Sequence, residues 1–193
     1  MAIHVEPEIY QGRPVDDGAR LPREREVYTL LDQLGIFYER ADHDVAATIE
    51  DCAAIEALLQ APICKNLFLC NRQQTQFYLL LMEGHKPFHT KDLSKLLGVS
   101  RLSFANETFM EELLHISPGS VSVMGLMNDT ENRVQLVIDR PVAEAPLIGC
   151  HPCINTSTLR LKTHDVLEVF LPGVHHTPII VDLPTEPMEE KQC

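Results

Sequence analysis

The sequence predicts an α+β fold: a single domain in which short helices flank a mixed, largely antiparallel β-sheet. The chain has 193 residues, 45% of them hydrophobic, which suits one domain with a full core and is short for two. Apolar runs of strand length occur in neighbouring pairs, as in hairpins. Helical patterns stand between these pairs without the regular strand–helix–strand alternation of a parallel sheet.

Two helices are expected before the first pair of strands. Apolar residues recur at i, i+3, i+4 and i+7 from Val27, which predicts a helix beginning near Pro22 and ending at Gly35. A second helix is expected after Thr48, because its hydroxyl can cap free backbone amides while Asp51 lies in the first turn.

The middle of the chain predicts a hairpin followed by short helices. The segments "KNLFLC" and "QFYLLLME" have the composition of strands, and the polar "NRQQT" joins them. Short helices are expected in "TKDLSKLLG" and "NETFMEELLH", on either side of "RLSF".

Strands dominate the second half. "SVSVMGLM" and "VQLVID" flank "NDTENR", which predicts a second hairpin. "LRLK" is expected to be a strand, "THDVLEVFLPG" a short helix stopped by Pro172, and "TPIIVDL" the last strand.

Composition divides the chain into three parts. Residues 1–20 are rich in Pro, Gly and charge and are expected to form an extended arm, residues 21–184 form the domain, and residues 185–193 form an acidic tail expected to be disordered. No apolar run approaches the ~18 residues of a membrane span, and the start lacks the apolar region of a secretory signal. We therefore expect a cytoplasmic protein without membrane contact, whose six cysteines are free thiols.

The charge of the chain is unevenly distributed. A formal net charge of −12 argues against a polyanionic partner. However, the segment from residue 65 to residue 101 carries a net charge of +4, from Lys65, Arg72, Lys86, Lys91, Lys95 and Arg101 against two acidic residues. Such a segment predicts a local docking site for a phosphate backbone, with an ordinary solvated surface as the alternative.

Most catalytic patterns are absent or weak. The chain lacks G-x-S-x-G, a phosphate-binding glycine loop and G-x-G-x-x-G. "CHPC" places Cys150 and Cys153 at a C-x-x-C spacing, but the "INTSTL" that follows makes a poor helix for a redox motif. A zinc site would need two more ligands, and the spacing of Cys64 and Cys70 fits no common knuckle. No metal or cofactor is expected, although a thiol or zinc protein remains an alternative.

Polar and glycine features at the ends of predicted strands carry a family resemblance. From about Val27 to Leu183, the chain resembles the YbaK-type aminoacyl-tRNA deacylases, and within them the free-standing prolyl-tRNA editing proteins of the ProXp-ala or PrdX type. The motifs that match, in the family's order and spacing, are "KNLFL", "LSKLLGVSRLSFAN", "PGSVSVMGLMND", "VQLVIDRPV" and "GCHPCINTSTLRL".

The resemblance implies trans-editing: hydrolysis of the ester that joins a wrong amino acid, first of all alanine, to a proline tRNA. A synthetase pocket sized for proline cannot strongly exclude a smaller residue, since a missing methylene changes the binding free energy by only ~1–3 kcal/mol. The implied partners are the tRNA acceptor end and prolyl-tRNA synthetase. A deacylase for cysteine or serine esters, and a non-catalytic sensor of aminoacyl-tRNA or a free amino acid, remain alternatives.

The resemblance also implies roles for individual residues. Lys65 would direct its ammonium group at the ester or the terminal ribose and phosphate, and Asn66 would form a hydrogen bond there. Backbone N–H groups around Gly119 and Gly149 would stabilise the tetrahedral intermediate, because glycine allows close approach. His151 would hold the substrate or the terminal adenosine, with the role of general base as the alternative.

Further residues are expected around these five. Relatives often carry proline at the position of Val123, so this residue is expected to shape the amino-acid pocket. Cys70 stands where relatives can carry a basic residue, so the acceptor-stem contacts would come from elsewhere. The other expected substrate contacts are Ser120, Pro152 and Asn155, and the expected tRNA contacts are Arg101, Lys86 and Lys91.

Overall fold

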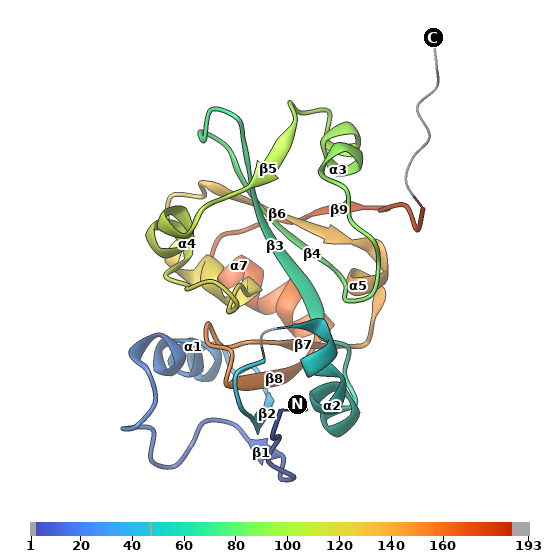
Figure 1. Cartoon of the computed structure of the whole chain (residues 1–193). Coiled ribbons are helices and arrows are strands. Elements are labelled where there is room, and N and C mark those ends of the chain that lie inside the picture. Colours follow the sequence, from blue (N-terminus) through green and yellow to red (C-terminus); the bar gives the residue numbers. More distant parts are fainter. Residues whose placement is uncertain (1–2, 47, 187–193) are drawn as a thin grey trace.

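Two β-sheets form the framework of the protein, seen here in a computed structural model that describes residues 3–46 and 48–186 (Figure 1). The described strands are Tyr10–Gln11 (β1), Glu39–Asp42 (β2), Cys64–Asn71 (β3), Phe77–Glu83 (β4), Leu102–Phe104 (β5), Val134–Asp139 (β6), Leu147–Cys150 (β7), Ser157–Lys162 (β8) and Ile179–Val181 (β9). One sheet has the order β1-β2-β8-β7 and is antiparallel. The other has the order β5-β3-β4-β6-β9, in which β6 runs parallel to β4 and β9. The predicted α+β class is confirmed.

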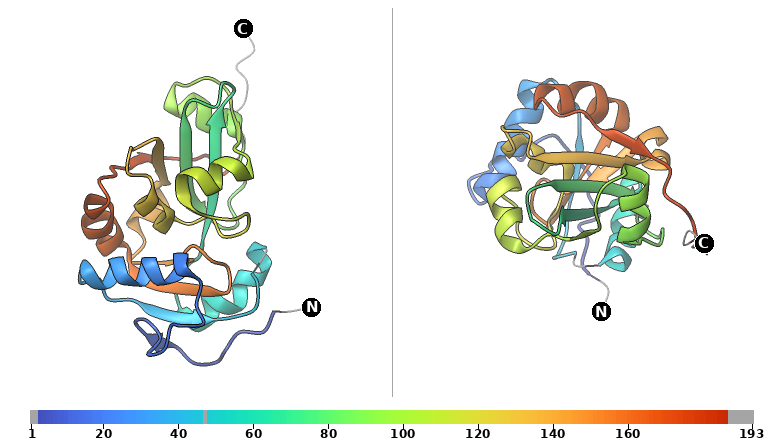
Figure 2. Two further views of the ribbon diagram at one scale, coloured as in Figure 1. Left: turned by 90° about the vertical axis from the view of Figure 1, so that its left-hand side faces the viewer. Right: turned by 90° about the horizontal axis from the view of Figure 1, so that it is seen from above.

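Short helices surround the two sheets (Figure 2). They are Pro22–Gln33 (α1), Ile49–Leu59 (α2), Thr90–Leu97 (α3), Glu107–Leu114 (α4), Arg140–Glu144 (α5), a 3₁₀ helix at Val123–Asn128, and a last helical stretch made of Thr163–Asp165 (α6), a π-helical turn at Val166–Phe170 and Leu171–Gly173 (α7). Both helices predicted before the first hairpin are confirmed. The Thr48 hydroxyl accepts from the Asp51 amide at 3.2 Å, and the Asp51 carboxylate accepts from the Thr48 amide at 3.0 Å, so the two residues cap α2 reciprocally.

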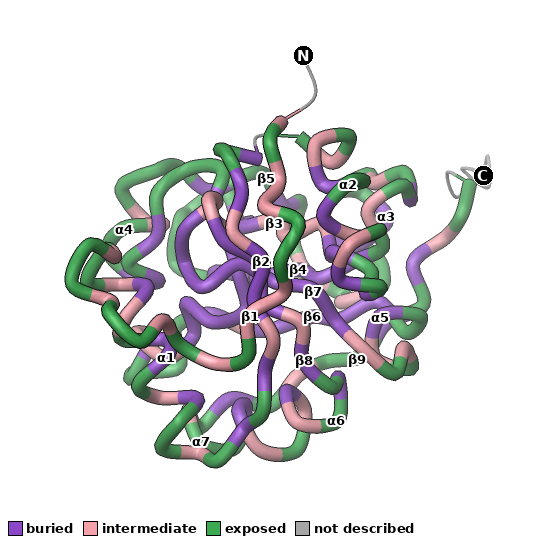
Figure 3. The backbone as a smooth tube through the Cα atoms, turned by 90° about the horizontal axis from the view of Figure 1, so that it is seen from below, coloured by how far each residue is buried: buried purple, intermediate pink, exposed green. Residues whose placement is uncertain are grey.

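The five-stranded sheet is covered on both faces. Along β3, Phe68 packs into the large core between the sheets, whereas Leu69 packs into a smaller cluster on the side of α3. The alternation continues on β4, where Leu79 faces the large core and Leu80 the smaller cluster. Apolar residues are therefore needed on both faces of the sheet, which explains the near-continuous apolar runs of β3 and β4. In Figure 3, buried backbone is concentrated toward the centre of the molecule. Burying each large side chain contributes about 1.5–3 kcal/mol.

The first predicted hairpin is confirmed, but the second is wrong. β3 and β4 pair antiparallel from Cys64↔Glu83 to Cys70↔Phe77. "SVSVMGLM" instead contains the 3₁₀ helix, whose first turn is capped where the Ser122 hydroxyl accepts from the Met124 amide at 3.2 Å. A serine at this position favours a helix start over a strand, because its side chain satisfies a free amide.

The last helical stretch passes the residue expected to stop it. Helical turns continue to Gly173, and Pro172 lies in the first turn of α7. The amide of Leu171 still donates to the Val166 carbonyl, so helical hydrogen bonding reaches the residue before the proline and the helix ends one residue after it. The strands predicted at "LRLK" and "TPIIVDL" are confirmed as β8 and β9.

The N-terminal arm is anchored along the edge of the antiparallel sheet. Tyr10 pairs with Arg40 in the β1–β2 ladder, and the Arg40 guanidinium lies 4.7 Å from the centre of the Tyr10 ring. The Arg20 guanidinium binds both carboxylate oxygens of Asp42, at 2.9 and 2.6 Å. In the expected acidic tail, residues 187–193 lie outside the described residues. No helix among the described residues is long and apolar enough to cross a membrane.

The two sheets meet where β3 begins beside β7. Ile63 forms a parallel bridge to Gly149, and the Gly149 amide donates to the Pro62 carbonyl at 2.8 Å. A Cβ atom on residue 149 would lie 2.8 Å from Cγ1 of Ile63, so this approach requires glycine. The junction places the first residues of β3 beside α2 and the loop that follows β7.

Candidate functional site

A cavity of about 180 Å³ lies at the junction of the two sheets. It brings together four residues predicted for the site: Lys65 and Asn66 from β3, Gly119 from the loop before the 3₁₀ helix, and His151 from the loop after β7. Pockets for drug-sized ligands occupy ~300–1,000 Å³. The cavity is therefore suited to a group of the size of one small amino acid.

The remaining lining residues were not predicted. Most come from α2 and the residues before it, a segment for which the sequence predicts a capped helix but no contact with a ligand. Val121 takes the place expected for Val123 as the apolar side chain of the glycine-containing loop. The unpredicted residues are Ala46, Thr48, Ile49, Cys52, Ile63, Cys64 and Val121.

Lys65 is half-buried, and its ammonium group is held by a backbone carbonyl. Nζ of Lys65 donates to the carbonyl of Lys86 at 3.1 Å. A carbonyl holds the ammonium group without neutralising it, so Lys65 brings a positioned positive charge to the cavity wall.

Lys86 is not placed as a tRNA contact. Its Nζ lies 2.7 Å from a carboxylate oxygen of Asp139, and the two side chains are only 7% and 0% exposed. The other Asp139 oxygen accepts from the Leu183 amide at 3.0 Å. Lys86 is therefore part of a buried ion pair that ties the β4–α3 connection to β6 and the residues after β9. This pair also positions the carbonyl that holds Lys65.

Asn66 presents a hydrogen-bond acceptor that the described residues leave unused. Its Nδ2 donates to the Cys64 carbonyl at 3.0 Å, which fixes the orientation of the amide. Its Oδ1 is buried and, within the described part of the chain, accepts no hydrogen bond. A buried acceptor without a donor costs ~1–3 kcal/mol, so this oxygen is suited to accept from a ligand in the cavity.

His151 is buried and neutral. Its Nδ1 lies 3.0 Å from the Ser157 carbonyl, which can only accept, so Nδ1 carries the proton and Nε2 is left as an acceptor. Behind it, Thr158 Oγ1 lies 3.3 Å from His151 Nδ1 and 2.9 Å from Nε2 of His43. Burial, opposed in part by the hydrogen bond to the Ser157 carbonyl and aided by the neighbouring His43, lowers the pKa of His151 to about 4. At neutral pH the ring is therefore a neutral acceptor.

The two predicted glycines have different roles. Gly119 lines the cavity with a φ of +82°, in the left-handed region that favours glycine. Gly149 does not line it, and its amide is bonded to Pro62, so it cannot donate to an oxyanion. Its role is to let β7 approach the start of β3. This corrects the expectation that both glycines surround the ester.

The other expected substrate contacts lie beside the cavity. Ser120 and Pro152 are buried but do not line it. Val123 is fully buried in the large core, so it cannot shape the amino-acid pocket directly. Asn155 packs against Gly119, because a Cβ atom at position 119 would lie 3.2 Å from its Nδ2. Asn155 thus supports the loop that carries Gly119 and Val121.

The remaining basic residues expected to bind tRNA are exposed. Lys91 lies on α3, and Arg101 directly precedes β5. Leu102, next to Arg101, pairs with Asn71, six residues along β3 from Lys65, which corresponds to ~20 Å. Arg101 is therefore too distant to touch an ester at the cavity.

The cysteines of "CHPC" are unsuited to thiol chemistry. Cys150 and Cys153 are free and buried. Burial raises the pKa of Cys153 to about 12 and raises the pKa of Cys150 as well, so both remain protonated thiols at neutral pH. The described residues also contain no group of three or more His, Cys, Asp or Glu side chains arranged to hold a metal ion.

Comparison with known proteins identifies the family. Residues 43–169 match the family model of the aminoacyl-tRNA editing domain. Prolyl-tRNA editing protein ProX of Acetoanaerobium sticklandii is 32% identical over 143 residues, which cover 74% of this chain and 87% of that protein. Prolyl-tRNA synthetase associated domain-containing protein 1 of Danio rerio is 31% identical over 159 residues, 81% of this chain and 85% of that protein.

A solved structure shares the fold. It is described as a candidate trans-editing enzyme for prolyl tRNA synthetase and superposes with a TM-score of 0.61 at 16% identity, covering 84% of this chain and 97% of that one. Fold and sequence thus agree with the resemblance carried by the motifs around Lys65 and His151. The chain belongs to the aminoacyl-tRNA editing domain family, as a YbaK-type prolyl-tRNA editing protein.

Proposed function

We propose that this protein is a trans-editing hydrolase that removes a small wrong amino acid, first of all alanine, from proline tRNA. One observation carries the proposal: a cavity of about 180 Å³ is lined by a positioned cation, an unused amide oxygen and a neutral imidazole. The naming of the relative from Acetoanaerobium sticklandii as a prolyl-tRNA editing protein supports it. A mischarged proline tRNA is a cytoplasmic substrate, and association with prolyl-tRNA synthetase would bring it to the protein.

The reaction needs no protein nucleophile. A water oxygen bonds to the ester carbonyl carbon, and the carbonyl electrons move onto the oxygen to give a tetrahedral oxyanion. The Lys65 ammonium group and the Gly119 amide are the donors proposed to stabilise this charge. As the oxyanion collapses, the bond to the ribose oxygen breaks and that oxygen takes up the proton lost by the water, which releases the amino acid and tRNA.

Asn66 and His151 are proposed to hold the substrate. The free Oδ1 of Asn66 would accept from the α-ammonium group of the amino acid. Nε2 of His151 would accept from the attacking water or from a ribose hydroxyl. With a pKa of about 4, His151 is a weak base at neutral pH, which supports positioning over general-base catalysis.

Selection against proline would follow from the size of the cavity. We propose that Ile49, Cys52 and Val121, the apolar side chains that line the cavity, surround the methyl group of alanine and clash with the ring of proline. A difference of a few methylenes in binding changes the ratio of the two hydrolysis rates only modestly. A wall that cannot move aside for the larger side chain excludes it sterically and provides the second sieve that editing requires. Esters of serine and cysteine are close to alanine in size and belong in the same assay.

The roles of Lys65 and Asn66 are tested by single-turnover deacylation of alanyl, seryl and cysteinyl esters of tRNA(Pro). Lys65→Ala is expected to slow hydrolysis of the preferred ester by about 10²–10³-fold, as expected for loss of an oxyanion donor. Asn66→Ala is expected to raise the substrate concentration needed for half-maximal rate. Lys162→Ala, which removes the same charge from an exposed position of β8, is the matched control. Equal rates for Lys65→Ala and Lys162→Ala would refute the proposed role of Lys65.

A further inference from the structure

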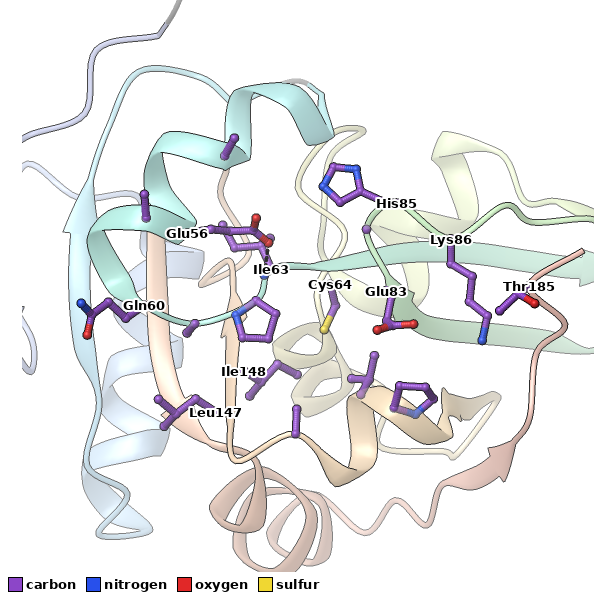
Figure 4. Close-up of a pocket in the computed structure, with 18 of the residues that line it drawn as sticks. Glu56, Gln60, Ile63, Cys64, Glu83, His85, Lys86, Leu147, Ile148 and Thr185 are labelled. Atoms are coloured by element: carbon purple, nitrogen blue, oxygen red, sulfur yellow. Dashed lines mark hydrogen bonds between the residues drawn. The ribbon is translucent and has the colours of Figure 1, made fainter.

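His151 faces the smaller of two adjoining cavities. The larger one, of about 760 Å³, shares Ile63 and Cys64 with it (Figure 4). The residues labelled in Figure 4 come from α2 and its end, the start of β3, the end of β4 and the turn after it, β7 and the segment after β9. His151 lines the smaller cavity and is not among the described residues around the larger one. The acceptor nitrogen of this ring is therefore available to the smaller cavity.

The strand order of the antiparallel sheet places a second histidine behind His151. β8 lies between β2 and β7. His43 directly follows β2, His151 directly follows β7, and Thr158 lies on β8. The ring centres of the two histidines are 6.1 Å apart. His43 is 7% exposed and Thr158 is 0% exposed, so their hydrogen bonds are shielded from competing water.

The neighbours of His43 fix the direction of the Thr158 hydroxyl. Nδ1 of His43 lies 2.7 Å from the Asp44 carbonyl, which can only accept, so Nδ1 carries a proton. Burial lowers the pKa of His43, so the ring is neutral at neutral pH and its Nε2 is an acceptor. The Thr158 hydroxyl lies 2.9 Å from this Nε2 and donates its single proton to it.

This direction determines what His151 meets. Thr158 Oγ1 lies 3.3 Å from Nδ1 of His151 and, with its own proton committed to His43, can only accept there. The Ser157 carbonyl, 3.0 Å from the same nitrogen, is also an acceptor. Without His43, the Thr158 hydroxyl would be free to donate to Nδ1 of His151. Such a bond favours the tautomer with the proton on Nε2, which would turn the acceptor at the cavity into a donor.

We propose that His43 is a positioning residue that, through the Thr158 hydroxyl, holds His151 in the tautomer with its proton on Nδ1. His43 does not line the smaller cavity, so it acts through its neighbours. The expected effect on hydrolysis rests on the proposed function, in which Nε2 of His151 accepts from the attacking water or a ribose hydroxyl.

The test combines ¹H–¹⁵N spectra of the ligand-free protein, which locate the ring protons, with single-turnover hydrolysis. In the wild type, His43 and His151 are both expected to carry the proton on Nδ1. His43→Phe keeps an aromatic ring but frees the Thr158 hydroxyl, so it is expected to shift His151 toward the Nε2 tautomer and to slow hydrolysis about tenfold. His176→Phe is the matched control, because it also removes a buried, hydrogen-bonded histidine but from a position that does not line the cavity, and it is expected to leave both readouts unchanged.

The double variant His43→Phe/Thr158→Val separates positioning from packing. It removes the misdirected hydroxyl, so His151 is expected to return to the Nδ1 tautomer and the hydrolysis rate to within about threefold of wild type. A double variant no faster than His43→Phe, an unchanged tautomer in His43→Phe, or a proton on Nε2 of either histidine in the wild type would overturn the inference. The wild-type spectrum needs neither a variant nor a substrate, so this failure is distinct from failure of the proposed function, which would appear as absent deacylation.

Discussion

Replacement of Lys86 by methionine tests the buried ion pair behind the candidate site. The change keeps most of the side-chain volume but leaves the Asp139 carboxylate, which is 0% exposed, without its cation. Removing one partner of a buried pair typically costs ~3–5 kcal/mol. Asp139 keeps its hydrogen bond from the Leu183 amide, so we expect the lower end, ~3 kcal/mol.

The assay is urea unfolding, with an exposed ion pair as control. Arg140→Met breaks the contact with Asp182 at 2.7 Å, where the side chains are 47% and 71% exposed, and is expected to cost less than ~1 kcal/mol. The double variant Lys86→Met/Asp139→Leu is expected to be more stable than Lys86→Met alone, because it removes the unpaired charge. A loss below ~1 kcal/mol in Lys86→Met, or a double variant less stable than the single one, would refute the reasoning.

The Lys86 variant also bears on activity. The Lys86 carbonyl accepts from the Lys65 ammonium group, so loosening this turn is expected to slow single-turnover hydrolysis without abolishing it. Lys86→Arg, which restores the charge, is expected to recover part of the rate. Unchanged hydrolysis in Lys86→Met would show that the turn does not position Lys65.

Three further predictions follow from burial around the site. The folded-state pKa of His151, about 4, lies below the unfolded value of ~6.5, so its contribution to stability should be complete above pH ~6.5 and fall by ~3 kcal/mol toward pH 4. Burial also lowers the pKa of His43, so urea unfolding should show a slope in both proteins that is steeper in the wild type than in His151→Gln; equal slopes would contradict the prediction. Gly149→Ala should lower the free energy of unfolding by ~1–3 kcal/mol, because its Cβ would lie 2.8 Å from Ile63 Cγ1; a neutral effect in urea would contradict the close approach. Cys150 and Cys153 should resist iodoacetamide in the native protein but react after unfolding, and mass spectrometry would detect native labelling that disagrees.

Local signals in the sequence were sufficient for most elements. The heptad-like apolar spacing from Val27 and the reciprocal cap of Thr48 and Asp51 predict α1 and α2, because helix formation depends on residues three or four apart. β3 and β4 follow from apolar runs separated by a polar turn. The parallel position of β6 between β4 and β9 was missed, because such pairing joins residues far apart in the chain. The division into two sheets was missed for the same reason.

The candidate site was predicted in part. Lys65, Asn66, Gly119 and His151 line one cavity, as the motifs around them suggested. The walls contributed by α2 could not be foreseen, because small apolar residues of a helix give no sign in the sequence of facing a cavity rather than the core. The ion pair of Lys86 was also missed, since its partner Asp139 lies 53 residues away.

The most direct test of the central claim is the ratio of single-turnover deacylation rates of Ala-tRNA(Pro) and Pro-tRNA(Pro) by the wild-type protein. If the cavity of about 180 Å³ is the amino-acid site, the alanyl ester should be cleared well above the buffer rate and at least about 10²-fold faster than the prolyl ester. Equal rates for the two esters would contradict selection by the size of this cavity. Rates no higher than in buffer for both would contradict the hydrolase itself.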